Sequence, residues 1–271
     1  MKEFKICKIC KNEITTINKT FNLVVCNSCK LIFSKTIFSE NDFIDIYDKL
    51  YNKTDQYKSH QLEFNKIKNN LYVNIGKPKL KILKFILKND IKSITEIGAG
   101  IGLVANYLTK IGKEYYGIEL DELTAKKAQS LKLNVDIGDF SKLEDVEYNQ
   151  DAIIAFEVIE HLQDLNHFFN LVKSKLKKNG YLGFTVPNYE KIKNYKNLSD
   201  KIYQTGPPIH LNYFTIESIK NIAEFYNFKV LMCETKKTPY LNLNKIDTYK
   251  FLYKSFIGKY YGPTLICILR N

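Results

Sequence analysis

From residue 91 onward, apolar segments of strand length alternate with amphipathic segments of helix length, and this pattern constrains the fold more than any other feature of the chain. The expected strands are short apolar runs bounded by turn residues, at 93–97, 114–118, 134–137, 152–156, 181–186, 229–232 and 264–269. The expected helices lie between them, at 103–111, 122–131, 165–176, 216–226 and 245–256. Such alternation is typical of a parallel sheet with right-handed crossovers and helices on both faces. The sequence therefore predicts an α/β domain.

The first expected strand runs into a glycine-rich turn, Gly98-Ala-Gly100-Ile-Gly102, which opens the next helix. Glycines at such a turn let a ligand approach the backbone and the helix N-terminus. The spacing is G-x-G-x-G, whereas the dinucleotide fingerprint is G-x-G-x-x-G. The preceding Glu96 would repel a pyrophosphate but suits a cationic ligand with an amino group. The turn therefore predicts a site for a ligand of that kind.

Acidic residues follow the next two expected strands. Glu119 lies 19 residues after Gly100, a position from which a carboxylate can accept hydrogen bonds from both hydroxyls of a ribose. Asp139 and Phe140 follow the third strand, where they could hold an adenine ring by a carboxylate contact and an apolar wall. The order of these residues along the chain predicts one nucleoside-binding edge of the sheet.

These motifs resemble those of the class I S-adenosylmethionine-dependent methyltransferases over roughly residues 79–271, and they read EIGAGIG (96–102), GIELD (117–121), GDF (138–140) and FEVIEHL (156–162). The resemblance implies a Rossmann-like seven-stranded sheet with the last strand antiparallel. It also implies that S-adenosylmethionine lies across the strand ends, with its aminoacyl end at Glu96, its ribose at Glu119 and its adenine at Asp139 and Phe140. The expected cofactor-binding residues are Glu96, Gly98, Gly100, Gly102, Glu119, Leu120, Asp139, Phe140 and Glu157.

Four of the six cysteines form two pairs near the N-terminus, Cys7/Cys10 and Cys26/Cys29, in a C-x2-C-x15-C-x2-C pattern. This spacing is typical of a four-thiolate zinc ribbon, in which soft thiolates hold the ion tetrahedrally. Four sulfur ligands leave no position for water, so the expected Zn²⁺ is structural. The alternative, a redox-active C-x-x-C pair, lacks a thioredoxin-like βαβ context. Cys233 and Cys267 stand alone and are expected to be buried as small hydrophobic residues.

The chain is expected to contain a zinc ribbon at 1–35, a helical bridge at 36–90 with helices at 60–72 and 78–87, and a methyltransferase domain at 91–271. As a whole it resembles small-molecule methyltransferases that carry an N-terminal zinc ribbon and occur in sugar and capsule biosynthesis. The matching stretches are CNSCKLIF (26–33), VPN (186–188) and HLNYFT (210–215). The resemblance implies methylation of a small polar acceptor, a hydroxyl of a sugar or a nucleotide-linked sugar, in surface-glycan biosynthesis.

His161 is the candidate general base, because it follows the fourth strand at the sulfonium end of the expected cofactor. The alternative is a histidine that caps a helix or satisfies a backbone carbonyl. Glu157, Glu160 and His161 share one face if their turn is helical. With His210 they resemble the E-x-x-E-H plus distal histidine of metal-dependent O-methyltransferases, including ubiquinone-pathway and small-RNA 2′-hydroxyl enzymes. Mn, Fe or Co would suit such ligands at least as well as Mg, although the same motif also occurs in enzymes without a metal.

The net charge of +12, from 41 basic and 29 acidic residues, is of the sign that nucleic-acid-binding proteins carry. Only Arg270 is an arginine, whereas phosphate and guanine recognition favours the arginine fork. Nucleic acid is therefore not the expected partner, and an RNA-modifying enzyme that grips phosphates with its ribbon and lysines is the alternative function. No apolar run reaches the ~18–20 residues of a membrane span, and no signal-peptide core is present, so a cytoplasmic protein is expected.

Two further expectations concern residues outside these motifs. The segment 188–213, with tyrosines at 189, 195, 203 and 213, is expected to cover the acceptor as a lid. His60 and His167 are expected to be structural.

Overall fold

The computed structural model describes residues 2–39, 41–43, 55–147, 149–193, 202, 205–235, 246–256 and 262–271. Its centre is a seven-stranded sheet in the order β12-β13-β10-β9-β6-β7-β8. The strands are β6 (Ser93–Ile97), β7 (Glu114–Glu119), β8 (Val135–Ile137), β9 (Gln150–Phe156), β10 (Leu176–Pro187), β12 (Lys229–Thr235) and β13 (Thr264–Arg270). Each expected strand is present. β10 begins earlier than expected, with an irregularity in its pairing to β9 between Leu176 and Tyr181.

Five neighbouring strands of the sheet pair in parallel, and the last strand of the chain reverses direction. β6 pairs with β7 and β9, β7 with β8, and β9 with β10, all in parallel. β13 inserts between β10 and β12 and is antiparallel to both. The expected fold class, a Rossmann-like seven-stranded methyltransferase sheet with its last strand antiparallel, is confirmed.

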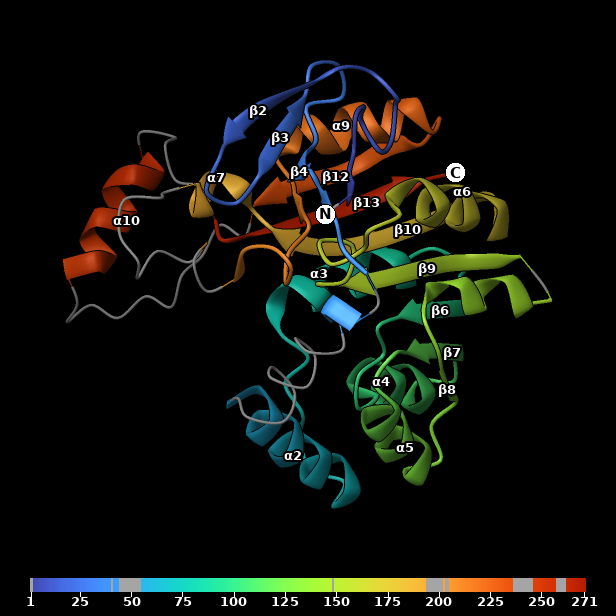
Figure 1. The fold of residues 1–271 in the computed structure, drawn as a ribbon. Coiled ribbons are helices and arrows are strands. Elements are labelled where there is room, and N and C mark those ends of the chain that lie inside the picture. Colours follow the sequence, from blue (N-terminus) through green and yellow to red (C-terminus); the bar gives the residue numbers. More distant parts are fainter. Residues whose placement is uncertain are drawn as a thin grey trace.

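Helices cover both faces of the sheet (Figure 1). On one face, buried side chains of α3 (Lys77–Leu87), α4 (Leu103–Lys110) and α5 (Glu122–Ser130) form one apolar cluster with the strands. On the other face, α6 (Leu165–Lys175) and α9 (Ile216–Phe225) contribute to a second cluster. These helices match the expected segments because each carries an amphipathic pattern, and Asp121, Asp164 and Thr215 cap the first turns of α5, α6 and α9.

The N-terminal region is joined to the main domain through a shared sheet and a shared core. β2 (Ile14–Asn18), β3 (Leu23–Cys26) and β4 (Ile32–Ser34) form an antiparallel sheet, to which β11 (Asn212–Tyr213) adds a fourth strand beside β4. Cys7, Leu31 and Phe33 are buried in the same apolar cluster as α6 and α9. The sequence did not predict β11, because two residues are too short to carry a strand period.

The remaining described elements are short or peripheral. α2 (Asp55–Lys68) lies in the segment expected to be a helical bridge, and it begins and ends earlier than the expected 60–72. α3, expected in the same segment, packs against the main sheet instead. β1 (Lys2–Glu3) pairs with β5 (Thr36–Ile37), η1 (Phe140–Asp145) follows β8, and α7 (Tyr189–Ile192) follows β10. α10 (Ile246–Phe256) lies at the edge of the molecule (Figure 1). In the described part of the chain, no helix combines the length and hydropathy that a bilayer crossing requires.

Candidate active site

A cavity of about 600 Å³ lies at the carboxyl ends of β6, β7 and β9, which is where open α/β sheets bind their ligands. Its walls come from the glycine turn, the ends of β7 and β8, the turn after β9 and the segment before β11. A larger hollow of about 760 Å³ lies at the opposite edge, around Ser93 and Glu114. Because parallel sheets present helix N-termini and loops at their carboxyl edge, the first cavity is the candidate site.

The glycine turn needs glycine for its backbone shape. Gly98, Gly100 and Gly102 have φ of 76°, 56° and 82°, in the left-handed region that disfavours other residues. A Cβ on Gly98 would lie 2.5 Å from Val158 Cγ2, whereas a Cβ on Gly100 would meet nothing within 4 Å. Gly98 and Gly100 line the cavity, and Gly102 serves instead as the N-cap of α4. The open space at Gly100 is where a ligand can approach the backbone.

Glu119 has a carboxylate that backbone donors hold in a fixed position. Its Oε2 accepts a hydrogen bond from Gly100 N at 2.7 Å, and its Oε1 accepts one from Asp121 N at 2.9 Å. The residue is 7% exposed and lines the cavity. Burial raises the pKa of Glu119, and these hydrogen bonds oppose that rise. Each oxygen has a second lone pair, so the arrangement can still receive two hydroxyl donors.

The other residues expected around the nucleoside also line the cavity. Leu120 is 53% exposed, so its side chain is open to a ligand. Asp139 caps η1 by accepting a hydrogen bond from Ser141 N at 2.9 Å. The Phe140 ring packs edge-on against Phe168, with ring centroids 5.6 Å apart. Phe140 is thereby held as one wall of the cavity.

Glu96 lies behind the cavity and does not line it. The residue is 1% exposed, and its Oε2 accepts a hydrogen bond from the Tyr115 hydroxyl at 2.5 Å. Burial raises the pKa of Glu96 to about 7, although Lys79 and the Tyr115 hydrogen bond act against that rise. In this arrangement the Glu96 carboxylate is turned to Tyr115 behind the glycine turn, and its expected contact with an amino group stays a prediction.

Glu160, His161 and His210 form a compact group at the cavity wall, with one ligand atom of each within 4.8 Å of the others. His161 Nδ1 lies 2.8 Å from the Ile209 carbonyl oxygen. A carbonyl only accepts, so Nδ1 carries the proton and Nε2 of the neutral ring holds the lone pair. Nε2 lies 3.9 Å from Glu160 Oε1, and the two imidazole rings are 4.8 Å apart. Burial lowers the pKa of His161.

His161 does satisfy a backbone carbonyl, which was the alternative role expected for it, but only its Nδ1 makes that hydrogen bond. Nε2 retains its capacity to accept a proton or bind a cation. None of residues 157–162 is helical: residues 159–161 form a turn, and Glu157 lies at a bend with a φ of 56°. Glu157 lines the cavity but is not part of the group that Glu160 forms with the two histidines. The shared helical face proposed for the E-x-x-E-H motif is therefore wrong for its first glutamate.

The cavity also includes residues that the motifs did not reveal. His60 and Glu63 from α2, Lys79 from α3, and Thr205 and Pro208 from the segment before β11 line its walls. His60, expected to be structural, thus faces a ligand site. No sequence motif marks these residues, because α2 and α3 carry only an amphipathic pattern, and only the packing of the bridge places them here.

The two described tyrosines of the segment expected to cover the acceptor do not line the cavity. Tyr189 and Tyr213 are 7% and 1% exposed and pack in an apolar cluster with Leu23 and Ile32 of the ribbon sheet. Tyr195 and Tyr203 lie outside the described residues. The contribution of this segment to the cavity comes from 205–210 instead.

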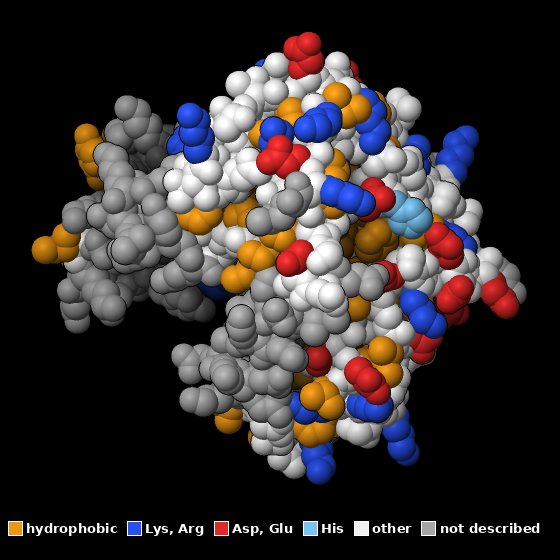
Figure 2. All heavy atoms as spheres, in the orientation of Figure 1, with side chains coloured by type: hydrophobic (Ala, Val, Ile, Leu, Met, Phe, Trp, Pro, Cys, Tyr) orange, Lys and Arg blue, Asp and Glu red, His pale blue; other side chains and the backbone are white. Residues whose placement is uncertain are grey.

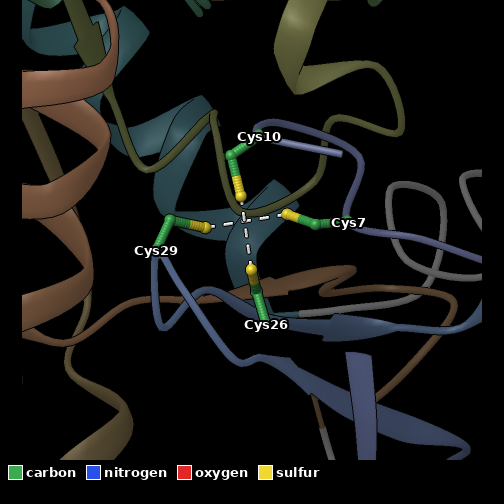
Figure 3. A group of neighbouring side chains, drawn as sticks. All are labelled: Cys7, Cys10, Cys26 and Cys29. Carbon is green, nitrogen blue, oxygen red and sulfur yellow. Dashed lines mark hydrogen bonds between the residues drawn. The ribbon is translucent and has the colours of Figure 1, made fainter. Parts of the chain in front are cut away.

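The four N-terminal cysteines converge on one point (Figure 3), with their sulfurs all within 4.8 Å of one another. Cys7 Sγ lies 3.6 Å from Cys29 Sγ, and Cys10 Sγ lies 3.3 Å from Cys26 Sγ. Tetrahedral zinc with bonds of about 2.3 Å would hold its sulfurs about 3.8 Å apart. Ile9 N donates to Cys7 Sγ, and hydrogen bonding by the Cys29 thiol lowers the pKa of Cys7 to about 5. The geometry and donor set fit a zinc site with four cysteine ligands.

A family model described as a methyltransferase domain matches residues 73–232, more than half of the chain. The chain belongs to the class I S-adenosylmethionine-dependent methyltransferase family. The solved structure of an S-adenosylmethionine-dependent methyltransferase from Archaeoglobus fulgidus has a TM-score of 0.54 at 19% identity, and covers 72% of this methyltransferase and 95% of that chain. At this identity the likeness shows the fold.

Two curated relatives are ubiquinone biosynthesis O-methyltransferases. The one from Hydrogenovibrio crunogenus is 27% identical over 142 residues, which are 49% of this methyltransferase and 56% of the relative. The one from Nitrobacter winogradskyi is 27% identical over 112 residues, which are 39% and 41% of the two chains. This methyltransferase therefore spans about half the length of the curated relatives that it matches.

Proposed function

We propose that this protein transfers a methyl group from S-adenosylmethionine to a hydroxyl of a small polar acceptor, with His161 as the general base. The single observation that carries the proposal is the hydrogen bond from His161 Nδ1 to the Ile209 carbonyl at the cavity wall. It leaves Nε2 with the lone pair, and the lowered pKa of His161 favours the neutral, proton-accepting ring. A positioned base of this kind contributes about 10²–10⁴-fold to a rate.

The cofactor would lie along the glycine turn, with its ribose hydroxyls donating to Glu119 and its adenine against Phe140. When bound, S-adenosylmethionine supplies an activated methyl group, because its positively charged sulfur leaves as a neutral thioether. The protein has to align the acceptor oxygen and remove its proton, and alignment alone can supply several kcal/mol. His161 Nε2 would take that proton as the oxygen forms its bond to the methyl carbon.

Glu160, His161 and His210 could instead activate the acceptor by binding a divalent metal. One carboxylate and two imidazoles suit Mn, Fe or Co better than Mg. Such an ion would bind the acceptor hydroxyl and lower its pKa. His161 would then be a ligand and not the base, so metal dependence separates the two roles.

We also propose that the N-terminal cysteines bind a structural Zn²⁺. Cys7, Cys26 and Cys29 are buried, and Cys10 is partly buried. A closed set of four sulfurs leaves no open position for water or substrate. The ion would therefore fix the two knuckles of the ribbon and take no part in the reaction.

The acceptor class that we propose to test first is the hydroxyl of a sugar or nucleotide-linked sugar. Support for a hydroxyl acceptor comes from the O-methyltransferase names of the curated relatives. The sugar class comes from the resemblance of the ribbon-bearing chain to sugar and capsule enzymes. Lysine and acidic side chains are interspersed on the face that Figure 2 shows, an arrangement that gives no support to an RNA-modifying role.

The test is transfer of labelled methyl from S-adenosylmethionine into a cell extract that is then separated into RNA, protein and small polar metabolites. Label in the metabolite fraction, lost in His161→Ala, is the expected result. Label in RNA would overturn the acceptor class. A mild chelator run in parallel decides the role of the metal: activity that is lost and then restored by Mn²⁺ favours the ion, and unchanged activity favours His161 as base.

A further inference from the structure

A buried lysine in the first ribbon knuckle contacts the main domain. Lys8 is 5% exposed, and its Nζ lies 5.1 Å from the ring centroids of both Phe4 and Phe33. Nζ donates a hydrogen bond of 2.8 Å to Asn212 Oδ1. Burying a lysine is unfavourable unless it is well partnered, and the partner here belongs to a segment 204 residues away.

Asn212 binds the backbone of the turn that carries Glu160 and His161. Its Nδ2 donates to the carbonyl oxygens of Ile159 at 2.9 Å and Leu162 at 2.7 Å. Its backbone N donates to the Glu160 carbonyl at 3.0 Å, and Leu211 N donates to the same oxygen at 2.8 Å. One asparagine therefore binds three carbonyls of the turn between β9 and α6.

Lys8 and the Ile159 and Leu162 carbonyls together fix which way this amide faces. Lys8 Nζ donates to Oδ1, because a lysine ammonium has donors and no acceptor. Nδ2 is then directed to the two carbonyls, which need a donor. The ribbon strand β4 adds to this connection, because Ser34 N donates to the Leu211 carbonyl at 2.9 Å and Phe33 pairs with Asn212 across β4 and β11.

We propose that Lys8 and Asn212 are positioning residues, through which the N-terminal ribbon sets the placement of His161 against His210. Both histidines depend on this link, since His161 lies within the turn and bonds to Ile209, and His210 directly precedes the clamped pair 211–212. The ribbon is then a working part of the active site. The role in turnover rests on the proposed function, but the geometric link can be tested without any acceptor.

The experiment compares Lys8→Met with Lys30→Met in the full chain. Met keeps the apolar length of the side chain and removes the donor. Lys30 is the matched control, because it lies in the other knuckle, is exposed, and its Nζ donates to the backbone carbonyl of Asn27 within that knuckle. The readouts are imidazole NMR signals, hydrogen exchange of the Leu211 amide, and affinity for S-adenosylhomocysteine.

In Lys8→Met we expect shifted signals for His161 and His210, unchanged signals for His60 and His167, and exchange at Leu211 that is faster by about tenfold or more. Affinity for S-adenosylhomocysteine stays within about twofold, and Lys30→Met matches the wild type throughout. A folded Lys8→Met protein with wild-type His161 and His210 signals would overturn the proposal.

Asn212→Asp provides the second variant should Lys8→Met not fold. It keeps an acceptor for Lys8 and replaces the amide donor, so the carboxylate faces the Ile159 and Leu162 carbonyls. The same changes at His161 are expected, and their absence overturns the proposal. Failure of the wild type to methylate any fraction would remove the proposed function alone, because the NMR comparison does not depend on turnover.

Discussion

Two groups of candidate metal-ligating side chains lie in the described part of the chain, and they are built in opposite ways. The four cysteines come from two short knuckles of the ribbon, and three of them are buried while Cys10 is partly buried. Glu160, His161 and His210 come from two segments about 50 residues apart and lie at the wall of a cavity. A closed all-sulfur site suits a structural ion, whereas an open mixed site suits chemistry on a ligand. The comparison indicates that local sequence builds the first group and tertiary contacts build the second.

The largest effect is expected from removing the closed group. Cys26→Ser with Cys29→Ser should abolish zinc binding and unfold the ribbon, because structural zinc contributes about 10–16 kcal/mol of apparent binding free energy in isolated fingers. Metal content by mass spectrometry and thermal unfolding measure this. Cys233→Ser is the control, since Cys233 lies in β12 away from the cluster. A double variant with wild-type zinc content and stability would contradict the structural role.

The open group is tested by comparing its two glutamates. Glu160→Gln should lower turnover, by at most the ~10²–10⁴-fold that a positioned base contributes, because Glu160 lies beside His161 Nε2. Glu157→Gln should have a much smaller effect on turnover, since Glu157 stands outside the group. Steady-state kinetics and Mn²⁺ titration of both variants check this. Equal losses in the two variants would show that Glu157 acts together with Glu160 and His161 despite standing outside their group.

The cofactor end of the cavity should respond separately from the catalytic end. Glu119→Ala should weaken S-adenosylhomocysteine binding on the order of 100-fold, because two hydrogen bonds to a charged acceptor are lost. His161→Ala should bind S-adenosylhomocysteine with the affinity of the wild type. Calorimetry on both variants measures the affinities, and a normal affinity in Glu119→Ala would show that the ribose lies elsewhere.

The smallest expected effect concerns the buried carboxyl of Glu96. Its folded-state pKa of about 7 is above the usual 4.5, so between these values the folded protein binds a proton that the unfolded chain has released. The contribution of Glu96 to the stability of the apo protein must then fall as the pH rises from 4.5 to about 7. Glu96→Gln should remove this contribution and stabilise the protein at a pH of about 8 by at most about 3 kcal/mol, with little effect at a pH of about 4.

Denaturant unfolding at both pH values measures the change. Glu224→Gln is the control, because Glu224 is exposed at the end of α9. If Glu96→Gln gains no stability at the higher pH, the pKa of the Glu96 carboxyl is not raised in the folded state.

Local patterns in the sequence were sufficient to predict the strands of the sheet and the clustering of the four cysteines. Strands such as β6 and β9 are apolar runs between turn residues, and the C-x2-C knuckles place two sulfurs by backbone geometry alone. The glycine turn was equally local, because only glycine meets its three positive φ values at little cost. The place of Glu119 beside the glycine turn was predicted from its distance along the chain from that turn.

Features that depend on contacts between distant segments were not visible in this way. Glu96 turned out to be covered by Tyr115, and Glu157 was separated from Glu160 by a turn that is not helical. His60 lines the cavity because α2 lies at its wall. Spacing along the chain carries no information about such packing, since it describes neighbours in sequence and not in space.

The amino-acid sequence by itself determined the class of fold, the order of the cofactor motifs and the clustering of the four cysteines, because each depends on residues within one or two elements. Only the tertiary structure decided that His161 bonds to Ile209, that β11 completes the ribbon sheet, and that Lys8 reaches Asn212. These contacts join segments up to 204 residues apart. They form because the ribbon, α6 and α9 bury their apolar side chains in one common core.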